Sequence, residues 1–191
     1  MNRIRIAALS AAVSLAALGV TTFAPVALAA EATVEVGGAP MFPSKNIVEN
    51  AVNSKDHTTL VAAVKAAGLV DTLMTPGPFT VFAPVNKAFE KLPAGTVETL
   101  LKPENKATLT AVLTYHVVPG RISAEDLKAM VKAGGGKATL TTVQGGTLTV
   151  MEAGRKIEII DSKGDKSIVT TPNVFQSNGV IHVVDTVLLP G

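Results

Sequence analysis

The chain has 191 residues, 47% of them hydrophobic and 17% charged, with no Cys, which is typical of one compact domain and excludes a disulfide scaffold. Its 17 Lys and Arg residues outnumber its 15 Asp and Glu residues only because of Arg3 and Arg5 near the start. The remaining chain is balanced in charge, which excludes a general attraction to nucleic acid or anionic lipid, and its apolar content excludes intrinsic disorder.

The first residues have the pattern of a secretory signal peptide. A short basic start is followed by an uncharged stretch of Ala, Leu and Val, and Ala27-Leu28-Ala29 forms a small-x-small cleavage site. We expect residues 1–29 to be cleaved, which leaves a secreted or periplasmic product with no membrane span. The alternative is a retained membrane anchor, because residues 6–30 carry no charge and approach the length of a membrane span.

The next segment, residues 30–43, mixes Gly, Pro and small side chains without a sustained period, which predicts a flexible N-terminal tether. A single folded domain is expected over residues 44–191. Apolar residues recur at helical spacing between residues 46 and 74. The proline-bounded run at residues 79–83, Phe-Thr-Val-Phe-Ala, predicts a buried strand.

The middle of the chain is predicted to be mainly helical. Asn86 is expected to cap a helical turn, and Pro103 is expected to open a helix that leads into an extended segment at residues 115–118. Ser123 and Asp126 have the spacing of a capping box and predict a further short helix.

The last third of the chain has a β pattern. Apolar residues alternate at positions 148 and 150 and again at 157 and 159, and residues 180–184 supply a closing strand. Helices therefore come first and strands dominate later, and the chain shows no internal repeat. This order predicts an α+β fold.

The chain lacks the sequence signals of common catalytic and metal sites. His57, His116 and His182 are too far apart for a zinc site built on local spacing, and no Gly-x-Ser-x-Gly elbow or Cys nucleophile is present. The glycines at 134–136 lack the flanking residues of a phosphate-binding loop, and residues 161–165 have too few oxygen ligands for calcium. We expect no enzyme activity, catalytic residue, metal or cofactor; a hydrolase assembled from distant residues stays open.

Three longer stretches carry a more specific signal. They are residues 77–89 (GPFTVFAPVNKAF), 113–120 (LTYHVVPG) and 177–190 (SNGVIHVVDTVLLP). In this order and spacing they resemble the first, central and closing signatures of the fasciclin domain family, over about residues 43–190. The resemblance implies a compact α+β fasciclin-like domain, in which a β-rich wedge or sandwich packs with N-terminal and central α-helices.

The resemblance also implies a secreted, non-enzymatic module for cell adhesion or protein interaction, with an unknown extracellular or cell-surface protein as partner. In some animal members of the family the tyrosine-histidine region is implicated in integrin binding. A second adhesion segment of such members has an acidic residue where this chain has Asn173, which argues against that kind of receptor. The residues that the resemblance assigns to partner binding are Tyr115, His116, Val117, Val118, Asn173 and Val174.

Two alternatives to this interpretation are open. Tyr115 and His116 lie between apolar residues, so hydrogen bonding inside the core is the other interpretation of both. The alternative function is an extracytoplasmic carrier of a small apolar ligand such as a carotenoid or lipid, because some fasciclin-domain proteins bind carotenoids in an apolar groove. The sequence is rich in small and aliphatic residues but does not specify a groove.

Overall fold

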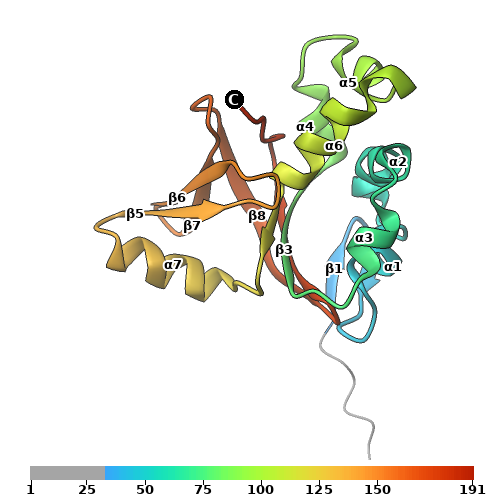
Figure 1. The fold of residues 1–191 in the computed structure, drawn as a ribbon. Helices are drawn as coiled ribbons and strands as arrows, with labels where there is room; N and C mark the ends of the chain where they lie inside the picture. Colours follow the sequence, from blue (N-terminus) through green and yellow to red (C-terminus); the bar gives the residue numbers. More distant parts are fainter. Residues whose placement is uncertain (1–32) are drawn as a thin grey trace, which may run out of the picture. The chain divides into compact units, whose positions relative to one another are not determined.

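The computed structural model describes residues 33–191, and the predicted signal peptide lies outside these residues. Figure 1 shows how the helices and strands are arranged. The helices are α1 (Ile47–Ala51), η1 (Lys55–His57), α2 (Thr58–Ala67), α3 (Val70–Met74), α4 (Asn86–Glu90), α5 (Thr96–Leu100), η2 (Pro103–Asn105), α6 (Lys106–Tyr115) and α7 (Ala124–Ala133). The strands are β1 (Val34–Val36), β2 (Ala39–Met41), β3 (Phe79–Pro84), β4 (Val117–Pro119), β5 (Lys137–Thr141), β6 (Thr147–Ala153), β7 (Lys156–Ile160), β8 (Lys166–Gln176) and β9 (Gly179–Val184). No helix in this part of the chain is both long enough and apolar enough to span a membrane.

The first described residues form a hairpin. β1 pairs antiparallel with β2 across Gly37 and Gly38, whose φ angles of 60° and 74° lie in the left-handed region that glycine adopts without strain. Val36 and Met41 are buried against the helices. The prediction of a flexible tether over residues 30–43 is therefore wrong for this hairpin. Two such short strands are stable only through packing against the rest of the domain, which a local sequence pattern does not reveal.

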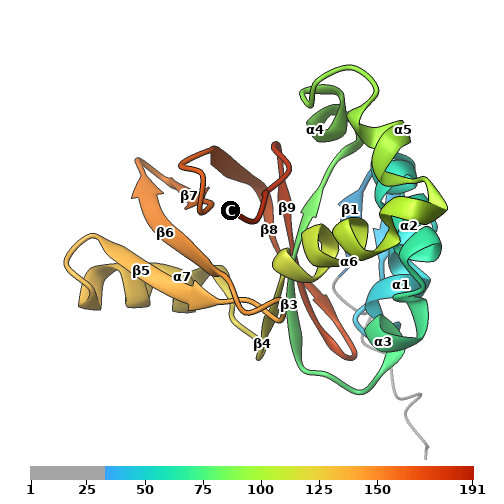
Figure 2. The same cartoon turned by 45° about the horizontal axis from the view of Figure 1, so that its top comes forward.

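The main sheet has seven strands in the order β4-β3-β9-β8-β7-β6-β5. β3 and β9, the second and third strands in this order, run parallel, and the other neighbours are antiparallel. The backbone N–H of Val143, just after β5, donates to the Val117 carbonyl of β4 at 2.8 Å. The sheet therefore curls until its two edge strands come together, and Figure 2 shows the end of β5 close to β4.

Successive side chains of β3 point to opposite faces of the sheet, because strand side chains alternate. Val81 and Ala83 pack with α1, α2, α4, α6 and the hairpin in what we call the helix-side core, which also contains Leu60 and Ile181. Phe82 points the other way. It packs inside the curled sheet, in what we call the barrel-side core.

The barrel-side core is closed by α7, which supplies Leu127 and Val131. Leu148 and Val150 of β6 and Ile159 of β7 have no exposed surface, as their alternation in the sequence predicts. The predicted α+β class and the fasciclin-like arrangement of sheet and helices are thus confirmed, with α7 packed against β5, β6 and β7 and the other helices on the opposite side of β3 and β9.

The helix caps confirm one sequence prediction and correct another. Ser123 and Asp126 form the predicted capping box at the start of α7, in which the Ser123 Oγ accepts from the Asp126 N–H at 3.1 Å and the Asp126 carboxylate accepts from the Ser123 N–H at 3.0 Å. Asn86 does not cap its own helix, since Val85 is the N-cap of α4. Its Oδ1 instead accepts from the N–H of Thr59 in the first turn of α2 at 3.0 Å, so Asn86 ties two helices together.

Candidate functional site

Tyr115 is the last residue of α6, and β4 begins two residues later, so the extended segment predicted at residues 115–118 is shorter than expected. The side chain is completely buried. Its hydroxyl donates to the Thr147 carbonyl at 2.6 Å and accepts from the Ser162 N–H at 3.0 Å. Gly146 is required beside the ring, because a Cβ at this position would lie 2.7 Å from the tyrosine Cε2. Tyr115 therefore fastens α6 to the curled sheet.

His116 is buried as well, and both ring nitrogens are bonded. Nδ1 lies 2.8 Å from the Val112 carbonyl, and Nε2 lies 2.9 Å from the N–H of Leu188. Since a carbonyl needs a donor and an N–H needs an acceptor, the ring is neutral with its proton on Nδ1. Burial lowers the pKa of His116 to about 4, against smaller opposing effects of the Val112 carbonyl and the Asp161 carboxylate.

Asn173 is half-exposed and joins α7 to the sheet. Its Oδ1 accepts from the N–H of Ala124 at 2.7 Å, and its Nδ2 donates to the Glu125 carboxylate at 2.8 Å. Its backbone adopts a left-handed φ of 57°, a conformation that Asn tolerates better than most residues. Its own N–H donates to His182 Nδ1 at 3.3 Å, and His182 Nε2 donates to the Ile122 carbonyl at 2.9 Å.

The six residues assigned to partner binding thus have contacts within this chain. The side chains of Tyr115, His116, Val117, Val118 and Val174 are buried, and Asn173 alone among the six is partly accessible. The observed hydrogen bonds of Tyr115 and His116 agree with the interpretation that both side chains are bonded inside the core. Their contact with a partner stays a prediction.

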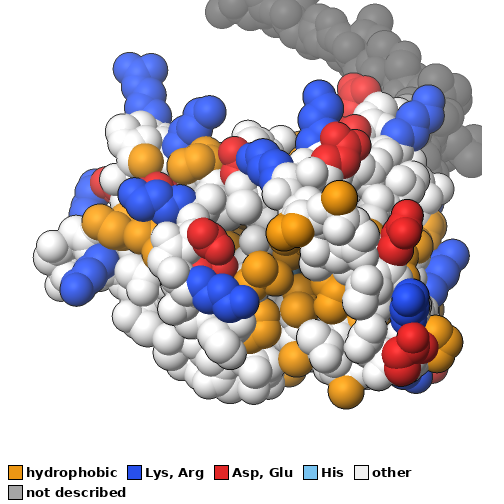
Figure 3. Space-filling model, turned by 90° about the horizontal axis from the view of Figure 1, so that it is seen from above, with side chains coloured by type: hydrophobic (Ala, Val, Ile, Leu, Met, Phe, Trp, Pro, Cys, Tyr) orange, Lys and Arg blue, Asp and Glu red, His pale blue; other side chains and the backbone are white. Residues whose placement is uncertain are grey.

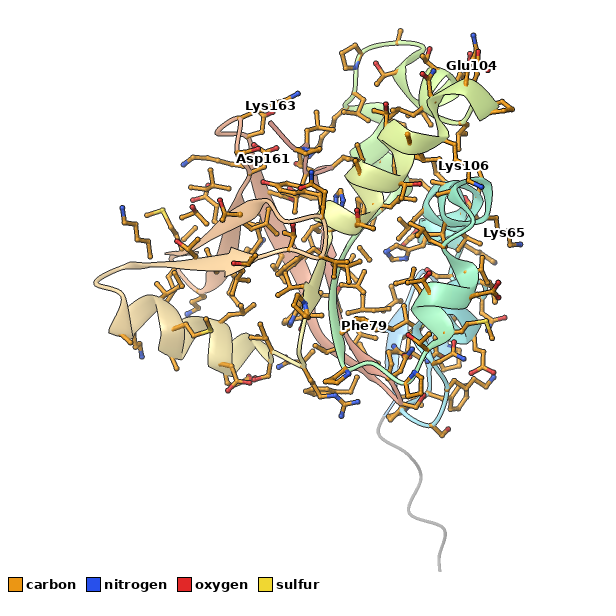
Figure 4. All side chains as sticks on the ribbon, in the orientation of Figure 1. Lys65, Phe79, Glu104, Lys106, Asp161 and Lys163 are labelled. Atoms are coloured by element: carbon orange, nitrogen blue, oxygen red, sulfur yellow. The ribbon has the colours of Figure 1, made fainter. Side chains whose placement is uncertain are left out.

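Sequence reasoning missed an apolar groove on the helix side. It lies between the helices α1, α2 and α3 on one side and β3, β9 and α6 on the other, and encloses a cavity of about 80 Å³. Its walls are almost entirely aliphatic or aromatic. Phe79 lies in the space between β3 and α3, as Figure 4 shows. The aliphatic residues that line the groove include Val48, Ala51, Val61, Val64, Val70 and Leu73.

The groove is open on one side. Val143, 48% exposed, and Lys65 lie at its rim, and Figure 4 shows the Lys65 side chain on the outer side of α2, directed away from β3. Figure 3 shows, from above, hydrophobic side chains that gather in a hollow beside charged residues. The groove walls therefore offer an apolar environment with a charged group only at the rim.

His57 is one of the buried polar residues in the wall of the groove. Its Nδ1 lies 2.9 Å from the Ser54 Oγ, but its Nε2 has no hydrogen-bond partner among the described residues. Burial lowers the pKa of His57, and the Ala83 carbonyl and the Asp56 carboxylate oppose this effect. The ring is therefore neutral near pH 7.

A second, more polar hollow of about 420 Å³ lies over Tyr115, Gly146, Thr147 and Ser162. The Tyr115 hydroxyl at its base already has a donor and an acceptor. The Tyr115 hydroxyl therefore offers a ligand in this hollow no unused hydrogen-bonding capacity. We take the groove as the better candidate site.

Known proteins match this chain both in sequence and in fold. The fasciclin domain family model matches residues 55–190. Protein sll1483 of Synechocystis sp. is 46% identical over 175 residues, which are 91% of this chain and 90% of that protein. The immunogenic protein MPB70 of Mycobacterium bovis is 37% identical over 145 residues, which are 73% of this chain and 66% of that protein.

Among solved structures, the pair of FAS1 domains from the insect cell adhesion molecule fasciclin I matches with a TM-score of 0.69. The sequence identity is 22%, and the match covers 84% of this chain and 58% of that one. At this identity the likeness concerns the fold. The curled sheet with its helical layers is therefore the arrangement of a FAS1 domain.

Proposed function

Because the chain belongs to the fasciclin domain family, we propose that it is an extracytoplasmic, non-enzymatic binding protein that carries a small apolar ligand in the helix-side groove. The observation that carries this proposal is the apolar lining of a partly open cavity next to an otherwise well-packed core. Apolar cavities of this kind hold apolar molecules rather than water. The extracytoplasmic location rests on the signal-peptide pattern at the start of the chain.

The size of the groove limits how a ligand is held. Its enclosed volume of about 80 Å³ is smaller than the roughly 150 Å³ of an apolar cavity that binds benzene. A long ligand therefore places only one end in the enclosed part and lies along the open side with the rest, or separates α1 and α3 from β3. Either arrangement gains affinity by removing apolar surface from water, at roughly 25 cal/mol per Å².

The test is a titration with Nile red, a neutral apolar dye whose fluorescence rises in an apolar site. Ala51 on α1 lines the groove, so Ala51→Phe fills it, whereas the neighbouring Val52 is 48% exposed and does not line it. The proposal predicts saturable dye binding by the wild type and by Val52→Phe. Binding by Ala51→Phe is expected to weaken at least about tenfold, a difference of about 1.4 kcal/mol. Equal binding by all three proteins would contradict the proposal.

A second candidate function is the protein-interaction module that the family resemblance implies. The description of the insect structure as a cell adhesion molecule supports it. The observation that favours it on this chain is Phe175, a large aromatic side chain that is 39% exposed two residues after the half-exposed Asn173. Exposed aromatic residues are enriched among the residues that dominate protein interfaces.

For this second function, Phe175→Ala is expected to weaken binding of a surface partner without loss of folding. The substitution Val143→Ala, at an apolar residue at the groove rim that is 48% exposed, is the control. Pull-down of a cross-linked partner from the host surface by the wild type and Val143→Ala, but not by Phe175→Ala, would support it. A partner retained equally by all three would refute the role of Phe175.

A further inference from the structure

His57 is placed where its imidazole faces both the core and the groove. It ends η1 and directly precedes α2, and its side chain is only 3% exposed. The neighbouring wall of the groove is made of aliphatic residues from α1 and α2. A polar ring at such a position is costly unless each nitrogen has a hydrogen-bond partner.

The hydrogen bonding of His57 differs from that of the two other histidines. His116 and His182 each have partners at both ring nitrogens. His57 has Ser54 at Nδ1, while Nε2 is buried without a partner among the described residues. The Ala83 carbonyl is close enough to raise the pKa of His57, but Nε2 has no partner that satisfies hydrogen-bond geometry among the described residues. His57 Nε2 is therefore a buried polar atom in the apolar groove that can still form a hydrogen bond with a ligand.

Ser54, Thr114 and His116 also line the groove, and their side-chain polar atoms have hydrogen-bond partners within the chain. Thr72 lines the groove as well but is exposed to solvent. The Thr114 hydroxyl donates to the Thr110 carbonyl at 2.7 Å within α6. The Ser54 hydroxyl is engaged with His57, and the Lys65 side chain lies on the outer side of α2. A ligand that lies against this part of the groove wall therefore meets His57 Nε2 as its polar contact.

We propose that the groove selects apolar molecules with a single neutral oxygen, a hydroxyl or a ketone, at the end that lies against His57, and that this oxygen hydrogen-bonds to His57 Nε2. This inference rests on the proposed carrier function. A hydroxyl serves either tautomer of the neutral ring, because it both donates and accepts, whereas a ketone requires the proton on Nε2. A carboxylate is disfavoured at this end, since a charge buried among aliphatic side chains has no cation there to pair with.

The experiment uses ligands of equal chain length: decane, decanol, decanone and decanoate, each displacing Nile red from the full chain. For the wild type, decanol and decanone are expected to bind about fivefold more tightly than decane, as one net hydrogen bond allows. In His57→Phe this preference is expected to disappear, while decane still binds. Thr114→Val removes a hydroxyl of the same groove that is already bonded, and is expected to retain the preference.

A measurement on the wild-type protein makes the test independent of how well the variant folds. Nitrogen-detected NMR resolves the imidazoles of the three histidines, and the His57 Nε2 resonance is expected to move on addition of decanol but not of decane. An unmoved resonance, as for a nitrogen that water already satisfies, would overturn the inference. So would an oxygen preference that persists in His57→Phe.

The two proposals fail in different ways. If decane and decanol bind the wild type equally well, and Ala51→Phe abolishes the binding of both, the carrier function is supported and the proposed role of His57 is refuted. If no member of the series displaces the dye, both proposals fall. If decanoate binds most tightly, the neutral-oxygen preference is wrong and the charged rim at Lys65 becomes the recognition site.

Discussion

The two cores on either side of β3 and β9 are built from the same strands but are completed differently. On the barrel side, Tyr115 and His182 have no exposed surface, and their side-chain polar atoms have hydrogen-bond partners. On the helix side, the packing leaves a groove with the unpartnered Nε2 of His57 in its wall. Counting hydrogen-bond partners therefore separates the buried polar residues that complete a core from His57, which has one ring nitrogen without a partner among the described residues.

The largest effect that tests this difference is expected from acid. Burial lowers the pKa of His116 to about 4 and also lowers the pKa of His57 and His182. Because the unfolded chain titrates at the ordinary pKa near 6.5, it binds more protons than the folded protein below that pH. The free energy of unfolding should therefore fall as the pH drops from 6.5 to 4, by about 3 kcal/mol for His116 alone.

Urea unfolding followed by circular dichroism at several pH values measures this slope. The pKa values of Glu125, Asp126 and Asp185 are lowered too, so their contributions are lost only at more acidic pH. Replacement of His116 by Gln should flatten the slope between pH 6.5 and 4. A wild-type stability that does not change over this range would mean that the histidines are not held neutral by burial.

A large-to-small substitution compares the packing of the two sides directly. Leu148 of β6 has no exposed surface, so Leu148→Ala is expected to cost about 3 kcal/mol of unfolding free energy. Leu73 of α3 is half-buried in the groove wall, and Leu73→Ala is expected to cost about 1 kcal/mol. Similar losses in urea unfolding would show that the groove wall is packed as tightly as the barrel side.

Removal of one hydroxyl probes the barrel-side network. Tyr115→Phe keeps the ring against Gly146 but leaves the Thr147 carbonyl and the Ser162 N–H without their partner. We expect a loss of about 2 kcal/mol, because both groups become unpaired inside the protein. Thermal unfolding of the variant beside the wild type measures the loss. No change in stability would mean that the hydroxyl has no structural role.

The smallest effect is expected for His57. Since Nε2 has no partner in the described chain, His57→Phe loses only the contact with Ser54 and should change the unfolding free energy by less than about 1 kcal/mol. His116→Phe, which breaks bonds at both nitrogens, is the matched comparison and should cost about 2 kcal/mol. Equal costs in urea unfolding would remove the distinction between the two histidines.

The sequence predicted those parts of the fold that rest on local chemistry. The Ser123 and Asp126 capping box and the buried strand at β3 follow from residue type and spacing, and both were predicted. The hairpin β1–β2 was missed although Gly37-Gly38 is a turn signal, because six strand residues have too little periodicity to compete with a loop interpretation. Asn86 was assigned to the wrong helix, since a side chain that caps across the chain leaves no local spacing to detect.

The candidate site could not be predicted from local sequence patterns either, because it depends on contacts between residues that are distant in the sequence. The groove brings α1 and α2 against β3 and β9, segments that are far apart in the sequence, and its depth depends on how these elements pack. Val48 and Val61 belong to the apolar faces of these helices, and the structure leaves both half-buried. The sequence pattern predicts an apolar face but does not say whether other residues cover all of it. His57 gave no signal, because a buried histidine is recognised as unpaired only when its neighbours in space are known.

Native mass spectrometry of the protein purified gently from its own host tests the central claim most directly. The account predicts that the wild type and Val52→Phe carry the added mass of one apolar molecule, that this molecule bears a neutral oxygen, and that Ala51→Phe carries none. The same bound mass on Ala51→Phe as on the wild type, or bare protein in all three samples, would contradict it.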